Sequence, residues 1–299
     1  MTTLTPTPAI HCQALTLEAT QPAAWWRRVP RQRVLDQCAL NLPVGSVTGL
    51  IGRNGAGKSS LIRCLLGLTP VSEGQARLLG EDSAQLSDAV RARLGYVPQS
   101  PELFGWMTGQ EHAEVAASLY PGHDRAWFEQ LAERFALPLQ QKADELAQGD
   151  QQKLALALAL AHHPTLLLLD EPVASLDPLA RRAFLRTLFE LPERDGEGDA
   201  PPRTVLISSH LLGDLERVVS HVCFMQAGQV QLMDEWDALL EHLRLHEVSA
   251  PIRHAAVRHS RATATGWQLL VDERRTPPPA LAQGGRGLCM DELFDVLNG

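Results

Sequence analysis

The sequence contains no long apolar run. Of its 299 residues, 44% are hydrophobic, yet no stretch approaches the roughly 18 to 20 consecutive apolar residues that a membrane-spanning helix needs. The first residues also lack the basic start and apolar core of a secretory signal. The sequence therefore predicts a chain that reaches a membrane only through a partner protein.

Positive charge and cysteine are also scarce. The chain carries 27 Lys and Arg against 35 Asp and Glu, a net charge of −8, with no long basic run. It therefore lacks the cationic face that displaces counterions from nucleic acid, and we expect no nucleic acid partner. Its five cysteines are dispersed and never spaced as C-x-x-C. This pattern predicts reduced cytosolic thiols and no structural metal site.

The most informative feature that is present is a glycine-rich segment. Residues 52–59 read Gly-Arg-Asn-Gly-Ala-Gly-Lys-Ser, which fits the phosphate-loop pattern of Gly, four residues, Gly, Lys and then Ser or Thr. An apolar run at 47–51 precedes it, and a segment with helical apolar spacing follows at 60–66. This is the strand, loop and helix order that the motif requires, whereas a plain glycine turn is the alternative. The chain is therefore predicted to bind a nucleoside triphosphate.

Each residue type in this segment suits a triphosphate. Glycines let the backbone approach phosphate oxygens, and the amides at a helix start point toward negative charge. Lys58 is expected to reach the β- and γ-phosphates, and the Ser59 hydroxyl to bind Mg²⁺. Ser60 either meets the nucleotide or packs against or caps the helix. The predicted nucleotide-binding residues here are Gly52, Asn54, Gly55, Ala56, Gly57, Lys58, Ser59 and Ser60.

Two acids end a second apolar run. Residues 165–171 read Thr-Leu-Leu-Leu-Leu-Asp-Glu, as expected of a buried parallel strand that delivers carboxylates at its C-terminal end. Asp170 is predicted to hold Mg²⁺, and Glu171 to polarise an attacking water. Helix capping is the alternative role for these acids.

Together these motifs resemble those of the ATP-binding cassette (ABC) ATPases, which drive ABC transporters. The chain also has Tyr-Val-Pro-Gln at 96–99, similar to the family's Q-loop, and Ser-Leu-Asp-Pro at 175–178, similar to its D-loop. Ser-Ser-His at 208–210 is similar to the histidine switch. The resemblance covers about residues 10–235. It implies an α/β, P-loop NTPase-type fold with a mostly parallel sheet, an antiparallel N-terminal β part and a helical insert.

The resemblance also assigns roles that the residue types alone leave open. Gln99 would contact the metal or water and relay the nucleotide state to a membrane partner, while His210 would contact the γ-phosphate and orient Glu171. Without the family pattern, a glutamine after proline is usually a turn residue and a lone histidine is usually structural. The predicted catalytic residues are thus Glu171, His210, Lys58 and Gln99, and the predicted metal ligands are Ser59, Gln99 and Asp170.

The segment in the place of the family's signature, usually Leu-Ser-Gly-Gly-Gln, departs from that pattern and reads Leu-Ala-Gln-Gly-Asp at 146–150. In the family this helix start binds ATP held by the opposite subunit of a dimer, so Ala147 and Gly149 are predicted contacts. Ala147 lacks the serine hydroxyl, a loss of roughly 1.5 to 3 kcal/mol for a bond to a charged group. Asp150 adds a negative charge unless it pairs with Lys153. We expect a weakened composite site, and the alternative is that backbone amides keep it working.

The aromatic residue that stacks on adenine in the family is missing from its usual place. After residues 14–19, which resemble the family's first strand, the chain inserts residues 20–28, with Trp25 and Trp26 next to two arginines. An indole offers a flat face for stacking, and Trp26 is the preferred candidate. Paired tryptophans beside arginines are also typical of a docking patch at an interface.

The chain is expected to comprise an ABC nucleotide-binding domain at 1–238, with a helical subdomain at about 100–163, and a small C-terminal α+β accessory domain at 239–299. Within the first domain, the apolar runs predict parallel strands near 47–51, 94–97, 166–169, 204–208 and 222–225. Within the second, they predict short strands between 247 and 275 and a terminal amphipathic helix at 290–297. The turn-rich stretch 193–202 is expected to be a surface loop.

The resulting hypothesis is an ATP-hydrolysing subunit of an ABC transporter, with ATP and Mg²⁺ as cofactors. It would form a homodimer, or a heterodimer with a second ABC ATPase, and drive an integral-membrane permease, as an exporter. It would be cytoplasmic, peripheral on the inner face of the cell membrane. The tail resembles those of ATPases paired with ABC-2-type permeases. The alternatives are a regulatory cassette with weak turnover and a soluble ABC ATPase of translation or DNA repair. The single phosphate loop disfavours the translation factors, which carry two cassettes in one chain, and the lack of extended heptads disfavours the repair ATPases with their long coiled coils.

Overall fold

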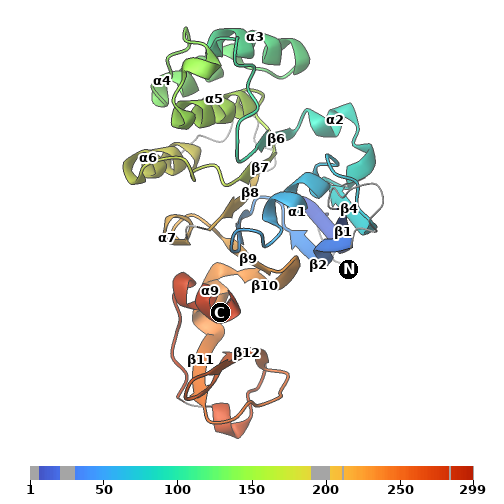
Figure 1. Ribbon diagram of the computed structural model, residues 1–299, viewed down its shortest axis with the longest axis vertical. Helices are drawn as coiled ribbons and strands as arrows, with labels where there is room; N and C mark the ends of the chain where they lie inside the picture. The colour runs from blue at the N-terminus through green and yellow to red at the C-terminus, as the bar shows by residue number, and fades with distance from the viewer. Residues whose placement is uncertain (1–6, 21–30, 190–202, 211, 283, 299) are drawn as a thin grey trace, which may run out of the picture.

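Three β-sheets and the helices around them make up the fold (Figure 1). The structure, a computed structural model, describes residues 7–20, 31–189, 203–210, 212–282 and 284–298. In Figure 1, helices α3, α4 and α5 lie at one end of the long axis, and strands β11 and β12 lie at the other. The sheet that carries the phosphate loop lies between these ends, so the predicted site is central in the molecule.

The central sheet has six strands in the order β10-β9-β3-β8-β7-β6. They are β3 (Val47–Ile51), β6 (Leu94–Val97), β7 (Leu166–Asp170), β8 (Thr204–Ser209), β9 (His221–Gln226) and β10 (Gln229–Glu235). All run parallel except β10, which pairs antiparallel with β9. The five predicted parallel strands are therefore confirmed. Every residue of β7 is buried, as expected of a parallel strand covered on both faces.

The register of this sheet brings the predicted motifs to one edge. Asp170 at the end of β7 lies opposite Ser208 of β8. Ile51 at the end of β3 lies opposite Ser209, also of β8. Because the carboxyl ends of parallel strands meet at the same edge, the phosphate loop, the two acids and the histidine segment start from neighbouring positions.

A four-stranded antiparallel sheet packs beside the central sheet, as predicted for the N-terminal part. In the order β2-β1-β4-β5 it contains β1 (Ile10–Thr20), β2 (Arg31–Leu42), β4 (Glu73–Leu78) and β5 (Glu81–Asp82). Helix α1 (Lys58–Leu65) buries Leu61 and Ile62 in the same hydrophobic cluster as Leu35 of β2 and Leu168 of β7. The short helix α2 (Asp88–Arg91) precedes β6.

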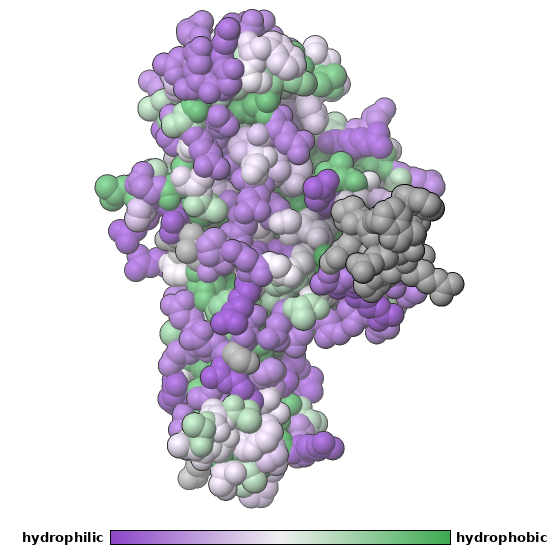
Figure 2. Space-filling model, viewed as in Figure 1, coloured by the Kyte–Doolittle hydropathy of each residue, from purple (hydrophilic) through white to green (hydrophobic). Residues whose placement is uncertain are grey.

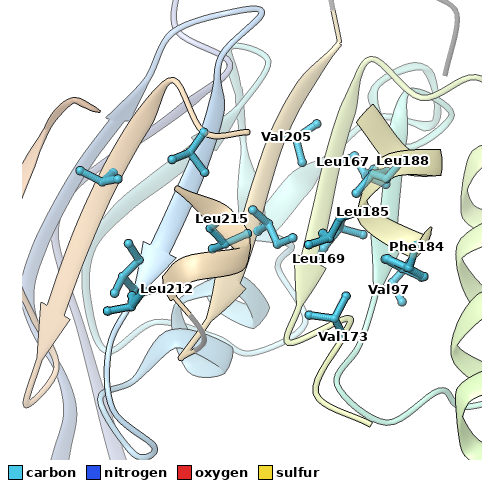
Figure 3. Close-up of a cluster of buried hydrophobic side chains, with 14 of the residues drawn as sticks. Val97, Leu167, Leu169, Val173, Phe184, Leu185, Leu188, Val205, Leu212 and Leu215 are labelled. Atoms are coloured by element: carbon cyan, nitrogen blue, oxygen red, sulfur yellow. The ribbon is translucent and has the colours of Figure 1, made fainter. Parts of the chain in front are cut away.

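The predicted helical insert is confirmed and is formed by α3 (Gly109–Leu119), α4 (Arg125–Arg134) and α5 (Gln148–Leu160). A reciprocal capping box fixes the start of α3: the Thr108 side chain accepts from the Glu111 amide, and the Glu111 side chain accepts from the Thr108 amide. Helix α6 (Pro178–Phe189) follows β7. In Figure 3 the side chains of Phe184, Leu185 and Leu188 lie beside those of Leu167 and Leu169 from β7.

The C-terminal part forms a three-stranded antiparallel sheet and a last helix. Its elements, with the short helices before it, are α7 (Leu212–Leu215), α8 (Trp236–His242), β11 (Leu243–Val248), β12 (Val257–Thr263), β13 (Gly266–Asp272) and α9 (Met290–Asn298). The predicted short strands and terminal helix are thus confirmed. Leu293 and Val296 of α9 share one hydrophobic cluster with Leu215 of α7 and Phe224 of β9. The domain boundary at 239 stays a prediction, and the predicted loop at 193–202 lies outside the described residues.

None of the helices in the described ranges is long and apolar enough to cross a bilayer. The face drawn in Figure 2 is hydrophilic over most of its area, and hydrophobic residues form small separate groups on it. Of the five free cysteines, four are buried and Cys289 is exposed.

Candidate nucleotide-binding site

The loop after β3 adopts a conformation that depends on its glycines. Gly55 and Gly57 have φ angles of 82° and 104°, in the left-handed region that favours glycine. Gly57 is also the N-cap of α1 and has no side chain with which to cap it. The first N–H groups of the helix, which have no intrahelical partner, are therefore free to bind an anion.

The Lys58 ammonium lies at the centre of the site. Its Nζ donates to the Gly52 carbonyl oxygen at 2.7 Å and pairs with Oε1 of Glu171 at 3.0 Å. The side chains of Lys58 and Glu171 are each only 5% exposed. Two charges buried to this degree stabilise each other, because an unpaired buried charge is strongly unfavourable.

Glu171 has a second partner in the predicted histidine switch. Nδ1 of His210 lies 2.8 Å from Oε2 of Glu171, and the His210 side chain is 38% exposed. Glu171 itself has a φ of 47°, a conformation that costs of order 1 to 3 kcal/mol for a residue other than glycine. The surrounding hydrogen bonds hold the carboxylate in this unusual orientation, facing both Lys58 and His210.

A serine that the sequence analysis did not single out as a separate site residue holds both acids. The Ser208 hydroxyl donates to Oδ1 of Asp170 at 2.7 Å and accepts from the Glu171 amide at 2.8 Å. Ser208 is fully buried. Its position opposite Asp170 follows from the register of β7 and β8, so a correct pairing of the predicted strands would have revealed it. Close by, burial and then the negative charge of Asp170 raise the pKa of Tyr96.

Lys58 and Glu171 border a pocket of about 290 Å³. The pocket is lined by Val34, Asn54, Gly55, Gly57, Lys58, Ser59, Ser60, Gln99 and Glu171. Eight of these nine residues belong to the predicted site, and Val34 of β2 was missed because nothing in its local sequence indicates a ligand. Gly52 and Ala56 are buried, and Gly52 contributes the carbonyl oxygen that accepts from Lys58. The hydroxyl of Ser59, the amide of Gln99 and the carboxylate of Asp170 are oxygen donors of the kind that Mg²⁺ prefers.

The signature residues do not line this pocket. Ala147 is the N-cap of α5 and makes no side-chain capping bond. A Cβ on Gly149 would lie 2.9 Å from Cδ2 of Leu176, so this glycine packs closely on the D-loop-like segment. Asp150 pairs with Lys153 at 2.8 Å, which offsets the negative charge expected to repel a triphosphate. Trp26, the candidate for adenine stacking, lies outside the described residues.

Comparison with known proteins agrees with this geometry. Residues 35–174 match the family described as ABC transporter. Over 201 residues the chain is 31% identical to the bacitracin transport ATP-binding protein BcrA of Bacillus licheniformis, an alignment that covers 67% of the chain and 64% of BcrA. The chain belongs to the ATP-binding cassette family.

Two further proteins are similar to this cassette. The Nod factor export ATP-binding protein I of Sinorhizobium fredii is 34% identical over 204 residues, which cover 66% of the cassette and 57% of that protein. A dimeric ATP-binding cassette solved in a post-hydrolysis state with ADP and Pi has a TM-score of 0.65 at 22% identity, covering 76% of this chain and 98% of that one. The similarity to the dimeric cassette shows that the two chains share a fold. The cassette spans less than two thirds of the length of both curated relatives.

Proposed function

We propose that this cassette binds ATP with Mg²⁺ and hydrolyses it, with Glu171 as the residue that polarises the attacking water. The observation that carries the proposal is the placement of the Glu171 carboxylate, which is buried, borders the pocket and contacts both Lys58 and His210. Ser59, Gln99 and Asp170 would hold Mg²⁺, which when bound neutralises charge on the phosphates. Phosphoryl transfer to water needs one positioned acceptor of this kind.

The two contacts of Glu171 imply an order of events. A triphosphate in the loop offers Lys58 phosphate oxygens in place of Oε1 of Glu171. The freed oxygen is then available to accept a proton from water. His210 keeps hold of the other carboxylate oxygen through Nδ1 and orients it, which leaves Nε2 to face the γ-phosphate. Lys58 therefore binds the triphosphate, His210 positions the Glu171 carboxylate, and Glu171 acts on the water.

The cassette is further proposed to act as a dimer, either with a second copy or with a different ABC ATPase. Support comes from Ala147 and Gly149, which begin α5 outside the pocket of their own chain and are thus available to the ATP of a partner. The names of BcrA and the Nod factor export protein support a role in transport and export. The partner would then be an integral-membrane permease, with the cassette at the cytoplasmic, inner face of the cell membrane. One observation favours the regulatory alternative, namely the missing hydroxyl at Ala147.

Hydrolysis of Mg-ATP by the purified chain tests this proposal. We expect steady turnover that falls by at least a hundredfold in Glu171→Gln, and an ATP-dependent dimer of that variant in size-exclusion chromatography. Glu129→Gln, at a half-exposed position on α4, serves as the control and should turn over normally. ATP binding without turnover, in the chain alone and with a permease, would favour the regulatory cassette. Unchanged turnover in Glu171→Gln would refute the assigned role.

A further inference from the structure

A glutamine near the start of α5 contacts the segment that carries Gln99. Gln152 is the fifth residue of α5 and is 1% exposed. Its Nε2 donates to the carbonyl oxygen of Pro98 at 3.3 Å. Pro98 immediately precedes Gln99, which lines the nucleotide pocket. One buried side chain therefore links the helix that begins at the signature residues to a residue of the site.

The other end of this amide has no partner. Oε1 of Gln152 is buried, and none of the described residues donates a hydrogen bond to it. The Pro98 carbonyl oxygen can only accept, so the NH₂ end of the Gln152 amide must face it. Turning the amide around would place Oε1 of Gln152 against the Pro98 oxygen and leave both oxygens without a donor. A buried unpaired carbonyl is unfavourable and uncommon in folded proteins, so its presence calls for a reason.

The adjacent glutamine does not share this feature. Nε2 of Gln151 donates to the carbonyl oxygens of Ala143 and Leu146 at 2.9 and 3.1 Å, so it holds the chain just before the helix. Gln152 alone of the two contacts the segment that carries Gln99. The same helix start also contacts the segment that follows Glu171 in the chain, because Gly149 packs on Leu176. The first turns of α5 therefore contact two segments, one next to Gln99 and the other after Glu171 in the chain, and both of these residues line the pocket.

We propose that Gln152 is a positioning residue that couples the signature end of α5 to Gln99. ATP bound against the signature residues, in the opposite subunit, would then influence the position of Gln99 in this subunit. The N–H of Gln99 belongs to the same trans peptide unit as the Pro98 carbonyl and points the opposite way, so it is not the partner of Gln152. With Oε1 unpaired, the side chain reaches the site through its bond to Pro98, which would pass a shift of α5 on to Gln99. The inference rests on the proposed ATP-driven dimer.

The variant Gln152→Met tests the coupling, because methionine has nearly the same length and no amide. It removes the bond to Pro98 and the unpaired oxygen together. We expect the melting temperature to stay the same or rise, and the Kd of the single chain for a fluorescent ATP analogue to change less than twofold. The kcat for ATP should fall about tenfold, and the dependence of the rate on ATP concentration should lose its cooperativity. Gln130→Met, at an exposed position on α4, is the matched control.

Hydrogen exchange supplies a readout that does not depend on turnover. We expect ATP to protect the peptide that contains Gln99 in the wild-type dimer and to give less protection in Gln152→Met. Equal protection in both, or an unchanged kcat, would overturn the coupling. A parallel fall in melting temperature, ATP binding and kcat would assign Gln152 a purely structural role. If the wild-type chain protects this peptide but never hydrolyses ATP, the proposed function fails while the coupling stands.

Discussion

The pairing of Lys58 with Glu171 has a consequence for nucleotide binding. The Lys58 ammonium and Oε1 of Glu171 form an ion pair at 3.0 Å, and both side chains are buried. Under the proposed function, ATP would compete with a carboxylate for the lysine and would also release the proposed base. The exchange of partners that admits the substrate would thus prepare Glu171 for the water. Such a site would keep its acid occupied until nucleotide is present.

Gly52 is a position where a single methyl group should disturb the phosphate loop. A Cβ at this residue would lie 2.6 Å from the carbonyl oxygen of Met225 and 3.0 Å from Cβ of Ala56. Because Met225 O is backbone of β9, it cannot move aside as a flexible side chain would. We expect Gly52→Ala to lower the melting temperature by several degrees and to raise the Kd for ATP at least tenfold, measured by thermal denaturation and calorimetry.

Gly213 provides the matched control for this substitution. A Cβ there meets nothing within 4 Å, and Gly213 lies in α7, where alanine is favoured over glycine by roughly 1 kcal/mol. Gly213→Ala should therefore leave ATP binding unchanged and not lower the melting temperature. Similar losses of ATP affinity in both variants would show that the close contact at Gly52 is not the cause.

The site residues that the sequence predicted are those whose chemistry is local along the chain. The phosphate loop, the two acids and His210 each follow a recognisable strand, so the parallel sheet brings them together. Ser208 and Gln152 act through partners 38 and 54 residues away, and each is an ordinary polar residue in its own segment. Their roles depend on strand register and on helix placement, which hydrophobic periodicity does not specify.

Among the elements, helix α5 combines an altered signature with an intact scaffold. The ion pair of Asp150 with Lys153 offsets one of the three departures from the family pattern. The others are Gln148 and Ala147, and the methyl group of Ala147 offers an approaching phosphate no hydrogen bond. The backbone amides at the start of α5 are still available there. The strength of a dimer built on this helix therefore depends on how much the missing hydroxyl contributes.

Ala147→Ser measures that contribution directly. A hydroxyl bond to a charged phosphate is worth roughly 1.5 to 3 kcal/mol. We therefore expect the dissociation constant of the ATP-bound dimer to fall about tenfold or more when Ala147→Ser is combined with Glu171→Gln, measured by analytical ultracentrifugation. Ala126→Ser, at an exposed position on α4, is the control. An unchanged constant would mean that backbone amides supply nearly all of the binding.

At the scale of the whole molecule, the C-terminal part and the nucleotide-binding part share a hydrophobic core. Periodicity in the sequence predicted its short strands and its last helix, but not which elements that helix packs against. Leu293 and Val296 of α9 are buried with Leu215 of α7 and Phe224 of β9. Helix α7 begins two residues after His210, and β9 pairs with β3, which leads into the phosphate loop. Helix α9 thus packs against two elements that adjoin those carrying the site.

Leu293→Ala tests whether this core makes the molecule one folding unit. Leu293 is 1% exposed, and removal of a buried leucine side chain costs about 2 to 5 kcal/mol. Because α9 packs on α7 and β9, which adjoin the elements that carry the site, we expect a single thermal transition at lower temperature, with loss of bound fluorescent ATP over the same range. Leu240→Ala, at a 40% exposed position on α8, should lower the transition temperature much less. Two transitions, with ATP release unshifted, would instead show that residues 239–299 unfold as a separate domain and that the site does not depend on α9.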